Sequence, residues 1–600
     1  MEKGETFMHK KTKIPKSLPQ YLTQYIVDQN YEQYTEKEHA IWRHIMKQSK
    51  IYFSKFAHKS YLEGLIRTGL CIDKIPKVED MNSKLSEFGW GAVCIRGFIP
   101  PLAFLDFQSR NILPIAADIR SLENITYTPS PDIVHEAAGH APIIANESYR
   151  KYLEKYAQVA RKAIYSKQDI INYEAIRELS DLKENHQHKK KDLLNAEKKV
   201  AETNKNITWV SEANEVARLY WWTVEYGLVK TLGENALYGA GLLSSIEESR
   251  TCLSEKIRKI PLSLDCIKQS YDITKKQPQL YVADNFTQLI DLLEQYEKTM
   301  CYLNGGLKST LKAQKSEAVT TTILNSNLGI SGVLNQVLTD KNKKIIFLKW
   351  QGPVQLSEEE NEIPGHGTSY HKQGFSTPIG KWSITKTPPS IVDDRFLFEN
   401  NMQKNNHYHL KFESGFSVKG TLKSWKRSRN SKLMLMSWKN CTVSYKQIIY
   451  FEPSWGIFDM AVGEKVDSVY GGPANYETYE KKVLSPPTRL SVVKEKTNKK
   501  DRKYLNMYKE LAMKRQVFES TKDKKDKIIE QVVEKFKKTE LIDWLLCHDL
   551  AELIQNHTTE AKNKKVFIEE IVLHAVNVLK DDKQAFYQLK KSLKLLDISI

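Results

Sequence analysis

The sequence has little of what marks a membrane, secreted or disulfide-bonded protein. No apolar run approaches the length of a membrane span, and the mean hydropathy is −0.51. The N-terminus is basic but lacks the apolar core of a signal peptide. The seven cysteines are scattered without CxxC spacing, so they indicate neither a disulfide framework nor a zinc ribbon. We therefore predict a cytoplasmic protein without membrane association.

A nucleic-acid-binding surface is also poorly supported, although the formal net charge is +18. Much of the excess lysine lies in residues 184–199 and from about Lys494 to Lys538. Both stretches interleave lysine with Glu and Asp, as solvated helices do. Neither has the combined aromatic and basic strip of a single-strand binder. The charge pattern therefore disfavours nucleic-acid binding.

The chain is too long for a single core, and about two to four domains are expected from its 600 residues. Apolar residues recur at helical spacing in the first half, alternate in twos from residue 341, and return to helical spacing near the end. We predict a mainly α-helical catalytic domain, then a β-rich domain and a C-terminal helical region. The predicted bounds are a flexible tail over 1–20, the first domain over 21–306 with a charged helical insertion over 163–205, a linker over 307–340 rich in Ser, Thr and Asn, the β-rich domain over 341–476 and the helical region over 477–600.

The most informative motif is PDIVHEAAGHAP, which places His135 and His140 five residues apart with Glu136 between them. In the zinc-peptidase motif H-E-x-x-H the histidines are four residues apart, so the extra residue disfavours a zinc hydrolase. On an ideal helix, five residues turn two side chains about 140° apart. Both histidines can reach one metal only if the helix ends or distorts near Gly139–Pro142, where glycine and proline permit it.

A third candidate ligand, Glu225, lies in the apolar segment LYWWTVEYGL. Two neutral imidazoles and one carboxylate are the ligand set of non-haem Fe(II) oxygenases, whose sites leave coordination positions open for O₂ and a reductant. Taken alone, the histidine pair would more often be one core and one surface histidine. Together with Glu225, it makes an iron-dependent hydroxylase the leading hypothesis.

Four motifs in order, YTPSPDIVHEAAGH, ARLYWWTVEYGL, LYGAGLLSSIEES and QPQLYVADNF, resemble the aromatic amino acid hydroxylases. This pterin-dependent family comprises the phenylalanine, tyrosine and tryptophan hydroxylases. The resemblance covers roughly residues 25–305. It implies the catalytic domain of that family and a monooxygenase acting on the ring of a free aromatic L-amino acid. It also implies Fe(II), a tetrahydropterin similar to tetrahydrobiopterin, and O₂.

The resemblance also implies roles for individual residues. His135, His140 and Glu225 would hold the iron. Ser244 would support the first histidine and the substrate, a contact that fixes the imidazole orientation. Glu136 and Tyr220 would lie near the pterin and the iron-bound waters. The pterin itself would contact the backbone of Gly97 and Ile99 and stack on Phe104, since a flat ring packs well on an aromatic side chain.

For the substrate, Arg120 matches the family's clamp on the amino acid's carboxylate, which a guanidinium can grip with two parallel hydrogen bonds. Thr128 would assist at the same end. The ring pocket would be lined by Pro131, Trp221, Tyr226 and Gly241. Ile273 lies where tyrosine hydroxylases carry an acidic residue, so phenylalanine is the preferred substrate. The neighbouring Asp272 leaves tyrosine open, and tryptophan is a further alternative.

The resemblance ends near residue 305, and the remaining half of the chain matches no family named above. A hypothesis from another class is a scaffold whose basic C-terminal half binds nucleic acid or another protein. The intact ligand set argues against an inactive first half but leaves the second half open. The C-terminal helices are candidates for oligomerisation.

Overall fold

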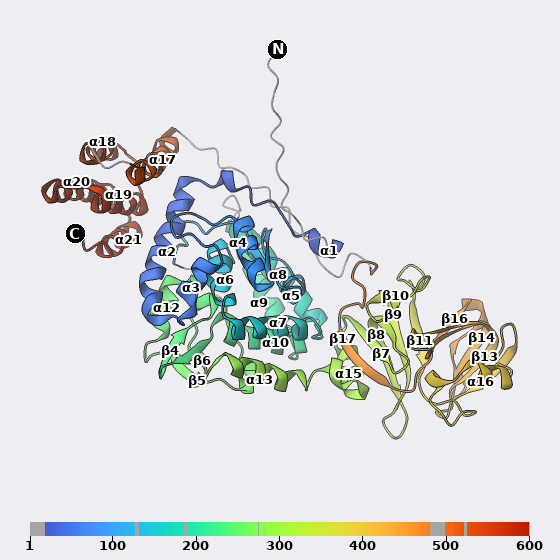
Figure 1. Cartoon of the computed structure of the whole chain (residues 1–600). Helices are drawn as coiled ribbons and strands as arrows, with labels where there is room; N and C mark the ends of the chain where they lie inside the picture. The colour runs from blue at the N-terminus through green and yellow to red at the C-terminus, as the bar shows by residue number, and fades with distance from the viewer. Residues whose placement is uncertain are drawn as a thin grey trace, which may run out of the picture.

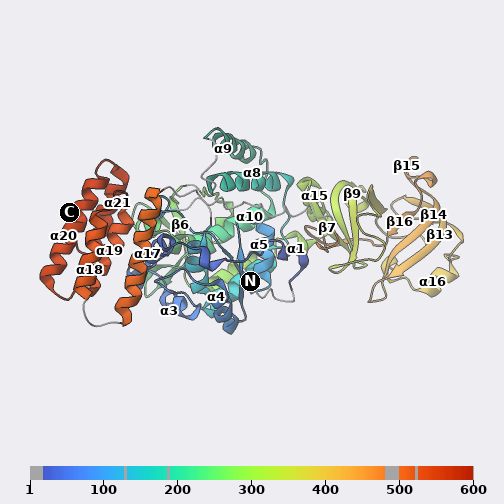
Figure 2. The same ribbon diagram turned by 90° about the horizontal axis from the view of Figure 1, so that it is seen from above.

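The computed structural model describes residues 18–126, 131–184, 190–273, 275–479, 499–520 and 525–598. Three parts lie in a row in Figure 2: the C-terminal helices, a central part formed by the first half of the chain, and a β-rich part. Most of the predicted tail over 1–20 falls outside the described residues. Within those residues, no helix is long and apolar enough to cross a membrane.

The central part is built from helices and two small sheets, and the sheet that contains β4, β5 and β6 lies at its edge (Figure 1). Its α-helices are α1 (Gln20–Thr23), α2 (Glu36–Phe56), α3 (Ser60–Arg67), α4 (Val78–Leu85), α5 (Pro101–Ser109), α6 (Ala141–Ile144), α7 (Glu147–Ala160), α8 (Lys167–Glu184), α9 (Lys190–Lys205), α10 (Glu212–Tyr220), α11 (Ala240–Ser244), α12 (Ile246–Cys252), α13 (Phe286–Glu297) and α14 (Cys301–Asn304). Two π-helical segments, η3 (Val134–His140) and η4 (Trp221–Glu225), interrupt this pattern.

The sheets of the central part are short. In the first, β1 (Gly91–Ile95) pairs in parallel with β2 (Ile112–Ala116). The second has the order β4-β3-β6-β5. Its strands are β3 (Leu228–Thr231), β4 (Glu234–Leu237), β5 (Arg258–Pro261) and β6 (Gln279–Ala283). The prediction of a mainly α-helical domain therefore describes this part incompletely, because helices share it with strands.

The charged insertion predicted over 163–205 contains α8 and α9, which lie against each other and project from the central part (Figure 2). Several contacts tie α8 back to the body, among them hydrogen bonds from Ser211 and Asn214 to the Asp169 carboxylate. The hydroxyl of Tyr173 donates to the carbonyl of Phe98 at 3.0 Å, and the two rings pack at 5.5 Å between centroids. The insertion thus contacts the loop that follows β1.

The predicted linker over 307–340 is wrong. These residues form helix α15 (Gly306–Ser316) and strands β7 (Val319–Leu324) and β8 (Leu328–Thr339). The Ser, Thr and Asn content indicates a loop. Threonine is β-branched, however, and suits a strand when the sheet accommodates its hydroxyl. Thr320, Thr321 and Thr322 are all buried within β7. The β-rich part therefore begins at Val319.

Two antiparallel sheets make up the β-rich part. The first contains β7, β8, β9 (Ile345–Glu358), β10 (Asn361–Glu362), β11 (Gly374–Pro378) and β17 (Val466–Gly471). The second contains β12 (His407–Lys411), β13 (Ser417–Arg427), β14 (Leu433–Tyr445), β15 (Ile448–Phe451) and β16 (Phe458–Ala461), with helix α16 (Asp394–Glu399) beside it. Two apolar clusters lie in this part, and each contains side chains from both sheets: Leu435 of β14 joins the cluster built mainly on the first sheet, and Phe347 of β9 joins the other.

The C-terminal helices pack against α2 of the central part (Figure 1) and share its apolar core. They are α17 (Lys499–Ser520), α18 (Lys525–Lys537), α19 (Trp544–His557), α20 (Ala561–Leu579) and α21 (Lys583–Lys594).

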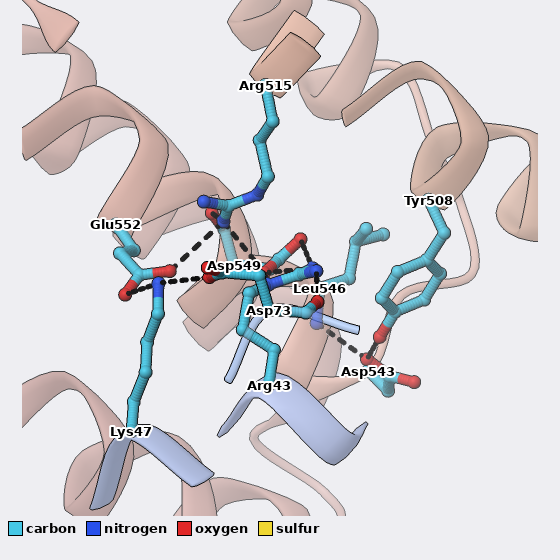
Figure 3. Close-up of polar contacts among 9 residues, drawn as sticks. All are labelled: Arg43, Lys47, Asp73, Tyr508, Arg515, Asp543, Leu546, Asp549 and Glu552. Carbon is cyan, nitrogen blue, oxygen red and sulfur yellow. Dashed lines mark hydrogen bonds and ion pairs between the residues drawn. The ribbon is translucent and has the colours of Figure 1, made fainter. Parts of the chain in front are cut away.

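A buried ion-pair network crosses this contact (Figure 3). Arg43 of α2 donates from Nε and Nη2 to the carboxylate of Asp549 on α19, at 2.9 to 3.2 Å. Arg515 of α17 reaches the same carboxylate at 2.8 Å and Glu552 at 3.1 Å. Lys47 of α2 donates to Glu552 at 2.7 Å. Because charges buried in this way must be paired, the network fixes how the helices dock.

Candidate metal centre

The two histidines of the central motif lie on a π-helix. The segment η3 runs over Val134–His140, so its hydrogen bonds connect residues five apart rather than four. That pattern brings side chains at i and i+5 to nearly the same face. The distortion predicted from the spacing is therefore present, and it extends over the whole motif. Gly139 allows close packing here, since a Cβ at that position would lie 2.7 Å from the carbonyl oxygen of Ala240.

Glu225 comes from the second π-helical segment, η4, whose apolar residues bury it in the core. Its Oε2 lies 3.4 Å from Nε2 of His135, and its Oε1 lies 3.2 Å from Nε2 of His140. The two Nε2 atoms are themselves 3.2 Å apart. Ligands bound at about 2.0–2.2 Å to one ion have separations of roughly 3 Å, so this triangle has the size of a metal site. The donor set fits a divalent ion with open positions.

A second carboxylate, that of Glu136, lies beside this triangle. Its Oε2 is 3.9 Å from Nε2 of His140, farther than either oxygen of Glu225, and it is grouped with the two histidines as a possible ligand. Because Glu225 faces both imidazoles at shorter distance, we favour Glu225 as the ligand. Among the described residues, Glu136 Oε2 is buried without a hydrogen-bond partner. Such an atom indicates a missing water or ligand at this position.

The carboxylates set the charge of the cluster. Burial lowers the pKa of His135, but the adjacent Glu225, with further help from Glu136 and Asp132, raises it to about 9. Burial opposes ionisation of Glu225, yet His140 and His135 lower its pKa. Burial raises the pKa of Glu136 despite both histidines. The cluster therefore contains one firmly ionised carboxylate and a second that holds a proton more readily.

Ser244 fixes the orientation of the first histidine. Its hydroxyl lies 3.0 Å from Nδ1 of His135 and donates to the carbonyl of Ala240 at 2.8 Å. Because the hydroxyl proton is used in that bond, the serine accepts a hydrogen bond from Nδ1–H. In the neutral imidazole this leaves the lone pair on Nε2, which faces Glu225 and His140. Ser244 therefore lies where it can orient the His135 ring.

Arg120 is buried and paired with Asp132, a residue that the sequence motifs did not single out. Nε and Nη2 of Arg120 each donate to one oxygen of Asp132 at 2.8 Å, and Nη1 donates to the Ser244 carbonyl at 3.0 Å. Asp132 also accepts from the backbone N–H of His135 at 3.0 Å. A single aspartate therefore positions both the arginine and the first turn of the histidine helix. In the sequence, the position of Asp132 three residues before His135 was the feature that could have identified it.

The residues predicted to line a ring pocket form an aromatic group. The rings of Trp221 and Tyr226 lie 4.6 Å apart between centroids, and Trp221 stacks on Tyr271 at 4.3 Å. Gly241 lies against Tyr226, so a Cβ there would be 2.8 Å from that ring. The hydroxyl of Tyr226 donates to Glu248 at 3.1 Å. Tyr271 belongs to this group although the sequence did not identify it.

The remaining predicted residues are spread more widely. Tyr220 is half-buried near His140, with 6.4 Å between ring centroids, and accepts a hydrogen bond from Gln108 at 3.3 Å. Ile273 is 39% exposed and Pro131 is also exposed, so packing within the protein does not by itself hold these two residues in a substrate pocket. Thr128 lies outside the described residues.

The three residues predicted for the pterin lie around the end of β1 and the start of α5. Gly97 has a positive φ of 67°, in the left-handed region that glycine tolerates best. Ile99 is buried and Phe104 is half-buried in one apolar cluster. Phe98, between them, carries the contact with Tyr173 of the insertion.

A buried triangle of two imidazoles and one carboxylate, beside an arginine–aspartate pair and an aromatic group, has the ligand set and the size of a mononuclear metal site. The model of the biopterin-dependent aromatic amino acid hydroxylase family matches residues 5–175 and 193–339, more than half of the chain. The chain belongs to this family.

Individual relatives match the central part. The phenylalanine-4-hydroxylase of Mesorhizobium japonicum is 27% identical over 274 residues, 45% of this chain and 83% of its own. That of Pseudomonas aeruginosa is 26% identical over 278 residues, 46% of this chain and 89% of its own. Among solved structures, Chromobacterium violaceum phenylalanine hydroxylase with bound iron(III) and 7,8-dihydrobiopterin is 26% identical, covering 46% of this chain and 88% of that one, with a TM-score of 0.37.

Proposed function

We propose that the chain hydroxylates the ring of free phenylalanine to give tyrosine, as a pterin-dependent monooxygenase. The observation that carries this proposal is the triangle of His135, His140 and Glu225 inside a member of this family. Relatives in several bacteria are phenylalanine-4-hydroxylases, which favours phenylalanine over tyrosine or tryptophan. The cofactors are Fe(II) and a tetrahydropterin, and the co-substrate is O₂.

Bound iron and reduced pterin would supply the activation of O₂, and the side chains would supply position and charge. His135, His140 and Glu225 would hold the iron on one face, which leaves the other face for reactants. Ser244 would keep Nε2 of His135 directed at the ion. Glu136 would hold or release a proton at Oε2 near the pterin, and Tyr220 would border the same space. Gly97, Ile99 and Phe104 would form the pterin site.

The substrate would be held by its carboxylate and its ring. Arg120 would serve as the carboxylate clamp through N–H groups other than the three that engage Asp132 and Ser244. Thr128 would assist, and Pro131, Trp221, Tyr226, Gly241 and Ile273 would surround the ring. Holding the ring beside the metal lowers the barrier by fixing orientation.

The test is an anaerobic Fe(II) loading of the full chain, followed by tetrahydrobiopterin, O₂ and each of phenylalanine, tyrosine and tryptophan. We expect tyrosine from phenylalanine, measured by chromatography, and little product from the other two. A His140→Ala variant prepared in parallel measures the background oxidation of free pterin. Absence of hydroxylated product from all three amino acids would overturn the proposal.

From the sequence we also propose a domain division, a cellular location and a role for the C-terminal helices. The chain divides into the central hydroxylase part, the β-rich part and the C-terminal helices. The protein works in the cytoplasm. The C-terminal helices mediate oligomerisation, which light scattering of the full chain against a variant lacking residues 499–600 would test.

A further inference from the structure

A second cluster of two histidines and one carboxylate lies in the β-rich part, away from the hydroxylase site. His366, His371 and Asp459 are buried, and one candidate ligand atom from each lies within 4.8 Å of the others. Nδ1 of His366 and Nε2 of His371 are 3.2 Å apart. The proposed hydroxylase function uses none of these residues.

The segment that carries the two histidines is firmly built. His366 donates its backbone N–H to Ile363 and accepts from Leu356 of β9, both at 2.9 Å. His371 accepts from Val354 of β9 at 3.1 Å. Gly367 lies between the histidines, where a Cβ would come within 2.5 Å of the Glu362 carboxylate. Both imidazoles therefore project from a backbone held to β9 on each side.

The carboxylate comes from the other sheet. Asp459 lies on β16 opposite Ser437 of β14, and the Ser437 hydroxyl donates to Asp459 Oδ1. The ring of Tyr370 lies 5.5 Å from that of His366, and the Tyr370 hydroxyl also hydrogen-bonds Asp459. Phe375 packs edge-on against His371 at 5.3 Å. Partners of this kind orient ligands in metal sites.

The distances and the chemistry suit an ion. Two nitrogens bound to one tetrahedral ion at about 2.0–2.1 Å would lie about 3.3 Å apart, close to the separation found here. Imidazole nitrogens and a carboxylate oxygen are ligands that Zn²⁺ and other first-row divalent ions take in proteins.

We propose that His366, His371 and Asp459 bind a divalent first-row transition-metal ion such as Zn²⁺, which links the two sheets of the β-rich part. Three protein ligands leave a fourth position, and the half-exposed Tyr370 lies beside the cluster. The alternative is a metal-free pair of histidines joined by a hydrogen bond. The metal site and the hydrogen-bonded pair both account for the separation of the two nitrogens, so a measurement of metal binding distinguishes them.

The test uses Co²⁺ as the probe, because its visible absorption reports the number and type of ligands. The full chain carries His140→Ala and Glu225→Ala, which disable the hydroxylase site, and is stripped of metal with a chelator. Equilibrium dialysis should then show one Co²⁺ bound per chain, with d–d absorption bands of an imidazole-containing site. No bound Co²⁺ in this background would overturn the proposal.

Added to that background, His371→Ala should weaken Co²⁺ binding at least ~10-fold, since even loss of a supporting partner costs that much. His407→Ala, at an exposed histidine of β12, is the matched control and should change nothing. Near-UV circular dichroism reports whether each variant folds. If His371→Ala does not fold, Asp459→Asn, which keeps the side-chain size, replaces it with the same expectation. Unchanged Co²⁺ affinity in the folded variant would overturn the ligand assignment.

Discussion

The hydroxylase cluster and the cluster of the β-rich part share a spacing but not a structure. In each, two histidines five residues apart bring ring nitrogens to 3.2 Å, and a carboxylate arrives from a distant element. The first pair lies on a π-helix, and the second lies on a segment held to a β-strand. The same sequence spacing is therefore compatible with two unrelated backbones, and the backbone must be known before the spacing can be interpreted.

Their electrostatics differ as well. In the hydroxylase cluster, neighbouring carboxylates raise the pKa of His135 to about 9, whereas burial lowers the pKa of His371 to about 4. The first cluster is rich in negative charge, and in the absence of metal it retains a proton. The second contains a single carboxylate, that of Asp459.

The largest expected effect comes from Glu225→Ala, which breaks the first cluster alone. Loss of a ligand that faces both imidazoles should reduce iron retention and lower tyrosine formation by more than about 1,000-fold, beyond the effect of losing a supporting partner. Metal analysis and product chromatography measure both. Glu247→Ala, at an exposed glutamate of α12, is the control. Full iron retention in Glu225→Ala would contradict the ligand assignment.

Asp549→Ala tests how strongly the C-terminal helices are docked on α2 of the central part, which holds the first cluster. It leaves Arg43 and Arg515 without their shared carboxylate, which should cost about 3–5 kcal/mol in docking free energy. Denaturant titration followed by hydrogen exchange in α2 and α19 measures it. Glu569→Ala, in an exposed pair with Lys565, should cost less than about 0.5 kcal/mol.

The contact between α2 and α19 also predicts that the stability of the protein depends on pH. Burial opposes ionisation of Asp549, but Arg515 and Arg43 lower its pKa below the ordinary value. A carboxylate with a lowered folded pKa stabilises above its unfolded pKa, about 3.9, and loses that contribution as the pH falls below it. The contribution of Asp549, measured as the stability difference from Asp549→Ala, should therefore be constant between pH 7 and 5 and diminish below about pH 4. A constant difference down to pH 2 would contradict this assignment.

A smaller effect is expected from Asp132→Asn. This variant tests how much activity depends on Asp132 holding Arg120 and the His135 backbone in place. The amide oxygen can replace Oδ1, which accepts from Arg120 Nη2 and the His135 N–H, but the NH₂ group cannot replace Oδ2, which accepts from the Nε and the backbone N–H of Arg120. We expect kcat/KM for phenylalanine to fall about 10–100-fold while iron still binds, as for other residues that orient ligands. Asp265→Asn, at an exposed site, is the control. A change of less than twofold would show that Asp132 is dispensable.

The smallest effect on hydroxylation is expected from His371→Ala. If the two clusters are independent, breaking the second should change tyrosine formation by less than about twofold, because substitutions without shared partners act additively. Product chromatography at saturating phenylalanine measures it. A large loss of activity in the folded variant would mean that the β-rich part is coupled to the hydroxylase site.

The sequence predicted much of the first cluster and nothing of the second. The motifs around His135 and Glu225 named the three residues of the triangle and Ser244, which lie together in the structure, and the five-residue spacing predicted a distorted helix. Asp132 was missed because its role appears only when the Arg120 side chain folds back onto it. His366 and His371 have the same spacing in GHGTSYH, but no family motif surrounds them, and Asp459 reaches them only through the packing of one sheet against the other.

Elements were predicted less well where polar residues are buried. The threonines of β7 indicated a linker, yet they lie inside a sheet where Thr321 exchanges a hydrogen bond with Ser331 at 2.8 Å. Composition shows that a residue is polar but not whether it finds a hydrogen-bond partner inside the protein. Helices with clear apolar faces, such as those of the C-terminal region, were accordingly easier to predict than this strand.

The docking of α19 on α2 has a consequence for synthesis of the chain on the ribosome. Arg43 and its carboxylate partner Asp549 are 506 residues apart. At roughly 5–20 residues per second, about 25–100 s pass between their emergence. In the later part of that interval the hydroxylase part has been synthesised, but the face of α2 that carries Arg43 lacks its cover. A chaperone or a second nascent chain would meet that face first.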